Sequence, residues 1–305
     1  MAGVSPYTHR NPMARRVFSL SVRNPPLDSY RPFVFSMSKS GKVDYWTSIN
    51  ADIDAHLKQA ISIRPPVTVF EPMHHLTFAA PESSAPALCI AACELVGGSR
   101  DWAMAAASAI HLMYAAAFTH ENLPLTDQTN RNCMLSTHKF GPNVELLTGD
   151  GMIPFGFELL SKMNDPAQNN PDRVLRAIIE ISRAMGSQGM IEGRYNELQY
   201  DESFPEAWLQ RVCAKKEGSL HACAAACGAI LGGGNEEDIE KLRRYGVYVG
   251  MIQGIYNKVE RNEVCLKEVN KLKKLALKEL KDFDEEKIKA ISSVVDDKFC
   301  HIISA

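Results

Sequence analysis

The chain has 305 residues, of which 45% are hydrophobic, and its formal net charge is −2 at pH 7. This length and apolar content suit a folded protein with a sizeable core, and the near-neutral charge argues against a nucleic-acid-binding protein. The apolar run 103–118 is too short to cross a bilayer and contains Ser108 and His111, so we expect no membrane span. Eight cysteines in sequence that is not loop-rich favour a reducing compartment over a disulfide framework.

The first 42 residues differ in composition from the rest of the chain. They are rich in Arg, Lys, Ser and Pro, and Asp28 is the only acidic residue before Asp44. Such a composition is typical of a transit peptide, with a disordered basic leader as the alternative. We therefore expect residues 1–42 to lie outside the fold and residues 43–305 to form one helical domain.

Hydrophobic periodicity in the first half of this domain predicts helices. Apolar residues recur every three or four positions over 43–61, and Pro65-Pro66 ends that pattern. The proline-containing segment 67–86 is expected to be a loop. A short helix is expected over 87–96, ending at Gly97-Gly98. The Ala-rich run 102–118 is apolar on nearly every side, which predicts a helix buried in a larger helical body.

The second half continues the all-α pattern. Helices are expected over 144–160, which Pro154 interrupts, over 172–185, and over 203–231 as one or two helices. Asn235 can cap a further helix that runs toward residue 259. The segments 267–280 and 285–295 have alternating charges, which indicates amphipathic helices with solvated outer faces. No strand pattern and no internal repeat stand out.

Three polar residues follow the Ala-rich run: Glu121, Asn122 and Asp127. Polar groups at the end of a core helix commonly meet a ligand. The segment resembles the first aspartate-rich motif of short-chain isoprenyl diphosphate synthases, in which Asp-Asp-x-x-x-x-Asp holds magnesium ions. Glu121 and Asn122 stand where that family has its paired aspartates, and Asp127 is retained. The similarity continues through 88–98, 149–151 and 228–234, and implies the isoprenoid synthase fold, antiparallel helices around a central cavity.

The second aspartate-rich motif of the family is degraded here. Its three carboxylate positions are occupied by Asn257, Lys258 and Arg261. Magnesium stabilises the diphosphate leaving group in such reactions, and exchanging one attractive carboxylate for a cation costs roughly 4 kcal/mol, or about a thousandfold in rate. The resemblance therefore implies no catalytic residue and no metal bound by this chain; a weakly held metal at Asn257 and Asp127 is the alternative.

Two further features bear on substrate binding. The basic loop that binds the homoallylic diphosphate in the family is replaced by Pro-Glu-Ser-Ser-Ala-Pro at 81–86, where Glu82 puts a negative charge in place of a cation. Lys216 is retained from the family's later Lys-Thr pair, with Glu217 beside it. The chain keeps the family framework and lacks most of its diphosphate-binding groups.

Two cysteine pairs, Cys89 with Cys93 and Cys223 with Cys227, lie four residues apart on helix faces. The spacing alone fits ordinary core packing of the cysteines. A zinc site and a disulfide within a pair fit the spacing less well. With the degraded motifs, the pairs resemble those of the small subunits of plant heteromeric geranyl or geranylgeranyl diphosphate synthases. That resemblance implies a partner-binding role for the four cysteines.

The same resemblance implies the function. We expect a regulatory, non-catalytic subunit in the plastid that binds a geranylgeranyl diphosphate synthase large subunit as a heterodimer or heterotetramer, modifies its activity, and shifts its products toward geranyl diphosphate. No cofactor is expected on this chain, and Mg²⁺ is expected in the partner. Two alternatives remain: a homomeric prenyl transferase using Asp127, Asp150 or Glu121 in an unusual metal site, and a helical terpenoid-binding protein.

Overall fold

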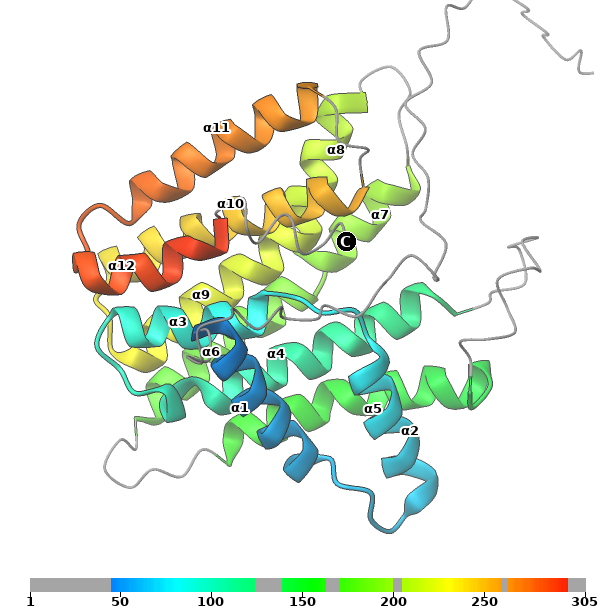
Figure 1. The fold of residues 1–305 in the computed structure, drawn as a ribbon. Helices are drawn as coiled ribbons and strands as arrows, with labels where there is room; N and C mark the ends of the chain where they lie inside the picture. The colour runs from blue at the N-terminus through cyan, green and yellow to red at the C-terminus, as the bar shows by residue number, and fades with distance from the viewer. Residues whose placement is uncertain (1–44, 124–138, 163–169, 200–204, 259–262, 296–305) are drawn as a thin grey trace, which may run out of the picture.

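The computed structural model describes residues 45–123, 139–162, 170–199, 205–258 and 263–295. Within these ranges all regular structure is helical, which confirms the predicted all-α class (Figure 1). The helices are α1 (Tyr45–Ala60), α2 (Val67–Ala79), α3 (Ala85–Leu95), α4 (Arg100–Glu121), α5 (Pro142–Ser161), α6 (Pro171–Met185), α7 (Met190–Leu198), α8 (Pro205–Cys213), α9 (Ser219–Gly232), α10 (Glu236–Lys258), α11 (Glu263–Glu279) and α12 (Glu285–Ser292). A π-helical turn, Ala214–Gly218, joins α8 to α9, and a 3₁₀ turn, Ser293–Val295, follows α12. The leader predicted at 1–42 lies outside the described residues.

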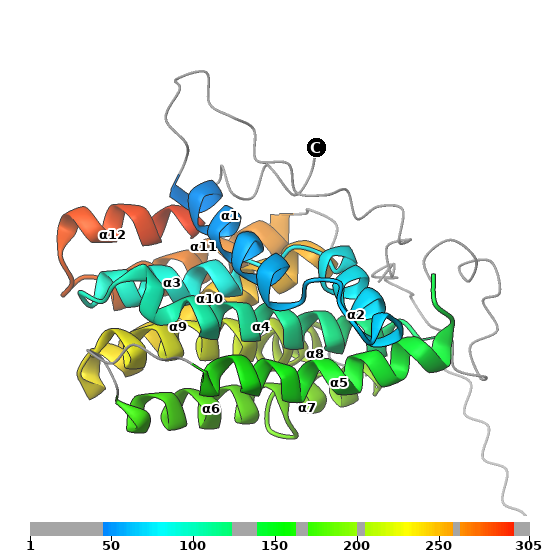
Figure 2. The ribbon, with the colours of Figure 1, turned by 90° about the horizontal axis from the view of Figure 1, so that it is seen from below.

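Helices α3, α4 and α9 form the centre of the bundle (Figure 2). The close approach of α3 and α9 depends on Gly228, because a Cβ there would lie 2.0 Å from the carbonyl oxygen of Cys89. The approach of α10 to α9 depends in the same way on Gly246, where a Cβ would lie 2.3 Å from the carbonyl oxygen of His221. Small residues therefore let these helix backbones pack closely.

Helix α4 contacts α2, α3, α5 and α9, which explains why its sequence is apolar on nearly every side. By length and composition it is long and apolar enough to cross a membrane, a property that the shorter run 103–118 did not have. Two thirds of its most apolar stretch is buried inside the protein, however. It is therefore placed as the core helix of the bundle.

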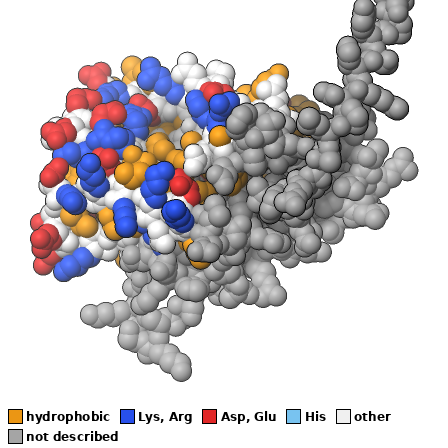
Figure 3. All heavy atoms as spheres, turned by 90° about the horizontal axis from the view of Figure 1, so that it is seen from above, with side chains coloured by type: hydrophobic (Ala, Val, Ile, Leu, Met, Phe, Trp, Pro, Cys, Tyr) orange, Lys and Arg blue, Asp and Glu red, His pale blue; other side chains and the backbone are white. Residues whose placement is uncertain are grey.

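Helices α11 and α12 cover one side of this core. α11 buries Cys265, Val269, Leu272 and Ala276 and exposes lysines on its opposite face. Figure 3 shows basic and acidic side chains interspersed around apolar patches on this face of the molecule. The amphipathic outer helices expected from the sequence are thus confirmed.

The prediction of a loop over 67–86 is wrong, because residues 67–79 form α2 despite Pro72. Met73 and Leu76 of α2 pack in an apolar cluster with Leu112 of α4 and Met152 of α5. Burial of these side chains stabilises the helix by more than the one backbone hydrogen bond that Pro72 removes. Pro154 likewise lies inside the continuous helix α5. In both segments tertiary packing outweighs the tendency of proline to break a helix.

Candidate functional site: the aspartate-motif positions and the exposed apolar side chains

The first motif position lies at the carboxyl end of α4. Glu121 is its last residue, and Asn122 follows as the C-cap. The Asn122 side-chain amide donates a hydrogen bond to the carbonyl oxygen of Phe118, at 2.8 Å, so its nitrogen satisfies the helix end. Asp127 lies outside the described residues. Of the three motif positions, only Glu121 presents a carboxylate in the part of the chain that the structure describes.

That carboxylate is paired with the retained lysine. The Lys216 ammonium nitrogen lies 2.9 Å from Glu121 Oε2 and 2.9 Å from Glu197 Oε2, and its side chain is only 7% exposed. Arg194 in turn donates to Glu197 at 2.7 Å. Burial lowers the pKa of Lys216, but the two carboxylates raise it by more, so its pKa lies above the ordinary value. Lys216 is therefore a charged ammonium held between two carboxylates.

The second motif lies near the end of α10. Asn257 is exposed there, while the side chain of Lys258 and the whole of Arg261 lie outside the described residues. Across the described ranges, no three His, Cys, Asp or Glu side chains converge as metal ligands. Magnesium prefers several hard oxygen ligands, and here the first-motif carboxylate is bound to Lys216 instead. The motif positions that the structure describes therefore offer no carboxylate that is not already paired with a cation.

The replaced substrate loop is tied to the core of its own chain. Ser84, next to α3, donates from its hydroxyl to Gln253 Oε1 at 2.8 Å. Its oxygen also lies 2.9 Å from His221 Nε2. The Ser83 hydroxyl accepts the backbone N–H of Ala85 at 3.3 Å. Since 81–86 contains no cation, this loop has nothing with which to attract a diphosphate.

His221 is the centre of this buried polar network, which links α3, α9 and α10. Its Nδ1–H donates to the carbonyl oxygen of Glu217 at 2.7 Å, and Nε2 lies 2.9 Å from Gln253 Oε1. Burial lowers the pKa of His221 to about 4, although the contacts of its ring with the Glu217 carbonyl and with Gln253 act in the opposite direction. The ring is therefore neutral at physiological pH and serves as a structural bridge.

The four cysteines are buried within the chain itself, where α3 packs on α9. Cys89, Cys93 and Cys227 are fully buried and Cys223 nearly so. The sulfurs of Cys223 and Cys227 are 3.8 Å apart, and all four thiols are free. No partner chain is present, so their role in partner binding stays a prediction. In this arrangement they can affect a partner only through the packing of α3 and α9.

Exposed apolar side chains lie on α5, α6 and α7, along the lower side of the bundle in Figure 2, and others lie on α2 and α11. On α6 and α7 they recur at helical spacing on one face of each helix. We call this set the apolar face; its members are Val144, Leu146 and Leu147 of α5, Leu175 and Ile179 of α6, and Ile191, Tyr195 and Leu198 of α7. Exposed apolar patches of this kind mark protein–protein interfaces.

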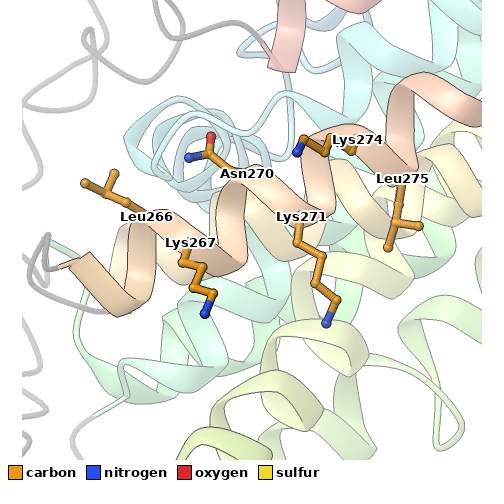
Figure 4. Close-up of a pocket in the computed structure, with 6 residues that line it drawn as sticks. All are labelled: Leu266, Lys267, Asn270, Lys271, Lys274 and Leu275. Atoms are coloured by element: carbon orange, nitrogen blue, oxygen red, sulfur yellow. The ribbon is translucent and has the colours of Figure 1, made fainter.

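A surface groove runs along α11 (Figure 4). Its lining is Leu266, Lys267, Asn270, Lys271, Lys274 and Leu275. Lys267 and Lys271 extend on the same side of the helix in the close-up, and none of the six lining residues is acidic. The groove lies on the solvated side of an outer helix.

Comparison with known proteins identifies the family. The model for polyprenyl synthetases matches residues 67–257. The chain belongs to the polyprenyl synthetase family. Within it, the chain is 53% identical over 260 residues to the heterodimeric geranylgeranyl pyrophosphate synthase small subunit 2, chloroplastic, of Cannabis sativa, covering 82% of this chain and 90% of that protein. The chloroplast location of this relative confirms the plastid location expected for the chain.

Solved structures in this polyprenyl synthetase family support the same placement. The geranyl diphosphate synthase small subunit from Antirrhinum majus is 57% identical, with a TM-score of 0.76, covering 82% of this chain and 97% of that one. A mint deletion mutant of heterotetrameric geranyl pyrophosphate synthase in complex with ligands is 53% identical, with a TM-score of 0.74, covering 83% and 99%. These likenesses confirm the isoprenoid synthase fold predicted from the sequence.

Proposed function

We propose that this chain is the non-catalytic small subunit of a heteromeric geranyl or geranylgeranyl diphosphate synthase. It binds a catalytic geranylgeranyl diphosphate synthase large subunit, modifies its activity, and shifts its products toward geranyl diphosphate. The ion pair between Lys216 and Glu121 carries the proposal, because it commits the first-motif carboxylate to a cation of the same chain. With Glu121 held by Lys216 and no carboxylate at the three second-motif positions, we expect no prenyl transfer by this chain alone.

The apolar face is the proposed site of association. A large subunit of the same family has the same fold, so this chain can take the place of one protomer in a family dimer. The relatives described above are subunits of heteromeric synthases, as their names state. Burying the apolar side chains of α5, α6 and α7 against the partner supplies the driving force for association.

The cysteine pairs support association indirectly in this proposal. Because Cys89, Cys93, Cys223 and Cys227 fill the contact between α3 and α9, they fix how these two helices pack at the centre of the bundle. Catalysis and Mg²⁺ binding are assigned to the large subunit. The chain itself contributes a folded surface and no cofactor.

Co-expression with the large subunit tests this function. We expect the two chains to co-purify as a defined complex, and the complex to release a larger fraction of geranyl diphosphate than the large subunit alone. The large subunit expressed without this chain is the control for product length. Failure to co-purify, or an unchanged product ratio in the purified complex, would contradict the proposal.

A further inference from the structure

Helix α7 has little apolar anchorage of its own. It has nine residues, and only Met190 and Gly193 are buried. Ile191, Tyr195 and Leu198 are exposed and belong to the apolar face. A helix this short is not stable by itself, so contacts with its neighbours must hold it in place.

Polar contacts join α7 to the elements beside it. Lys216 binds Glu197 of α7, and it binds Glu121 of α4 through the same nitrogen. Arg194, one turn before Glu197 on α7, completes a row of four alternating charges: Arg194, Glu197, Lys216 and Glu121. Two positive and two negative charges balance, so this cluster does not call for a further cation.

The backbone is shaped to bring Lys216 to this position. Lys216 lies in the π-helical turn Ala214–Gly218, where the helix is locally widened and the directions of the side chains change. On the other side, a Cβ at Gly193 would lie 2.6 Å from Lys216 Cγ and 2.9 Å from its backbone nitrogen. Gly193 therefore permits α7 to lie directly against the turn that carries the ammonium.

We propose that Lys216 is a built-in cation that closes the degraded metal site and clamps α7 to α4, and thereby positions the α7 part of the apolar face for the large subunit. This rests on the proposed function for the partner, whereas the clamp itself is a property of the single chain. The Glu121 carboxylate at the first motif is thus used for structure: it joins the end of the core helix to a helix on the surface.

A neighbouring lysine provides a matched control. Lys215 lies in the same turn and also pairs with α7, through Glu192 at 2.8 Å and the carbonyl oxygen of Gln188 at 3.2 Å. Both members of the Lys215–Glu192 pair are more than a third exposed, so solvent screens it. Lys216 is almost fully buried. Removing Lys216 takes the ammonium from the partly buried Glu121 and leaves Glu197 with Arg194, while removing Lys215 affects only an exposed pair.

The test measures hydrogen exchange of the α7 amides in the isolated full-length chain, together with affinity for the large subunit. We expect Lys216→Met to accelerate α7 exchange by about a hundredfold or more and Lys215→Met by less than about tenfold, with α9 amides unchanged in both. Lys216→Met should also weaken binding of the large subunit by about tenfold or more. Mg²⁺ alone should leave exchange of the unmodified chain unchanged.

Several results would overturn the inference. If Lys216→Met leaves α7 exchange unchanged, or affects it no more than Lys215→Met does, Lys216 is not the clamp. Faster exchange with unchanged affinity would remove α7 from the partner-binding role. Should Lys216→Met fail to fold, Glu121→Gln decides, since it deletes one charge of the same cluster and must accelerate α7 exchange. If the unmodified chain does not bind the large subunit, the proposed function fails while the exchange data still decide on the clamp.

Discussion

The buried imidazole of His221 makes the folding stability of the chain decrease as the pH falls, because burial disfavours the protonated ring. Its pKa is about 4 in the folded chain, against 6.5 for an ordinary histidine. Between these values the unfolded chain is protonated and the folded chain is not, so stability is complete above pH 6.5 and falls as pH decreases toward 4. Each pH unit in this window is worth about 1.4 kcal/mol, and from pH 7.5 to 5 the loss comes to about 2 kcal/mol.

Urea unfolding at pH 7.5 and pH 5 measures this loss, and a His221→Asn variant isolates it. Asparagine keeps an N–H that can donate to the Glu217 carbonyl but does not titrate. His111, whose pKa is also lowered by desolvation, remains in both proteins and cancels from the comparison. The variant should lose about 2 kcal/mol less than the parent between the two pH values. An equal pH dependence in both proteins, with equal m-values, would refute the assignment.

Three further predictions concern the site, the interface and the cysteines. Glu121→Asp with Asn122→Asp should create no prenyl transfer, because the second motif still lacks its carboxylates; robust turnover of this double variant in a product assay would be contrary evidence. Leu198, on the apolar face, is 68% exposed, and Leu198→Glu should weaken co-purification with the large subunit by at least about tenfold without lowering the melting temperature. The control is Leu277→Glu on α11, where the leucine is 42% exposed; this variant should leave co-purification unchanged. Cys227→Ser should lower the free energy of unfolding in urea by about 1–3 kcal/mol, because it places a hydroxyl in an apolar contact. It should also weaken association with the large subunit. Full stability with unchanged affinity would leave Cys227 without a role in packing or in association.

The helices whose local sequence pattern matches their burial in the fold could be predicted from the sequence. The Ala-rich run over 102–118 became α4, because a helix surrounded by others needs apolar residues on all sides. Asn235 caps α10, since its side-chain oxygen accepts the backbone N–H of Asp238 at 2.9 Å. Helix α2 was missed because its stability comes from packing on α4 and α5, which local sequence does not record.

The site was predicted less completely, for the same physical reason. The sequence indicated that Glu121 and Lys216 matter, yet 95 positions separate them and nothing local indicates that they form an ion pair. Glu197 was missed entirely, because it lies on a short helix with a weak apolar pattern. Identifying the His221 network required the packing of α3, α9 and α10. An i,i+4 cysteine pair similarly defines one face of a helix but not what that face contacts.

We propose that this chain contributes no active site to the complex. The most direct test of this proposal is a prenyl transfer assay of the purified chain alone, with Mg²⁺, isopentenyl diphosphate and an allylic diphosphate, beside the large subunit and the reconstituted complex under the same conditions. We expect no product from the chain alone and a product mixture from the complex that is enriched in geranyl diphosphate. Turnover by the chain alone at a rate approaching that of the large subunit would contradict it.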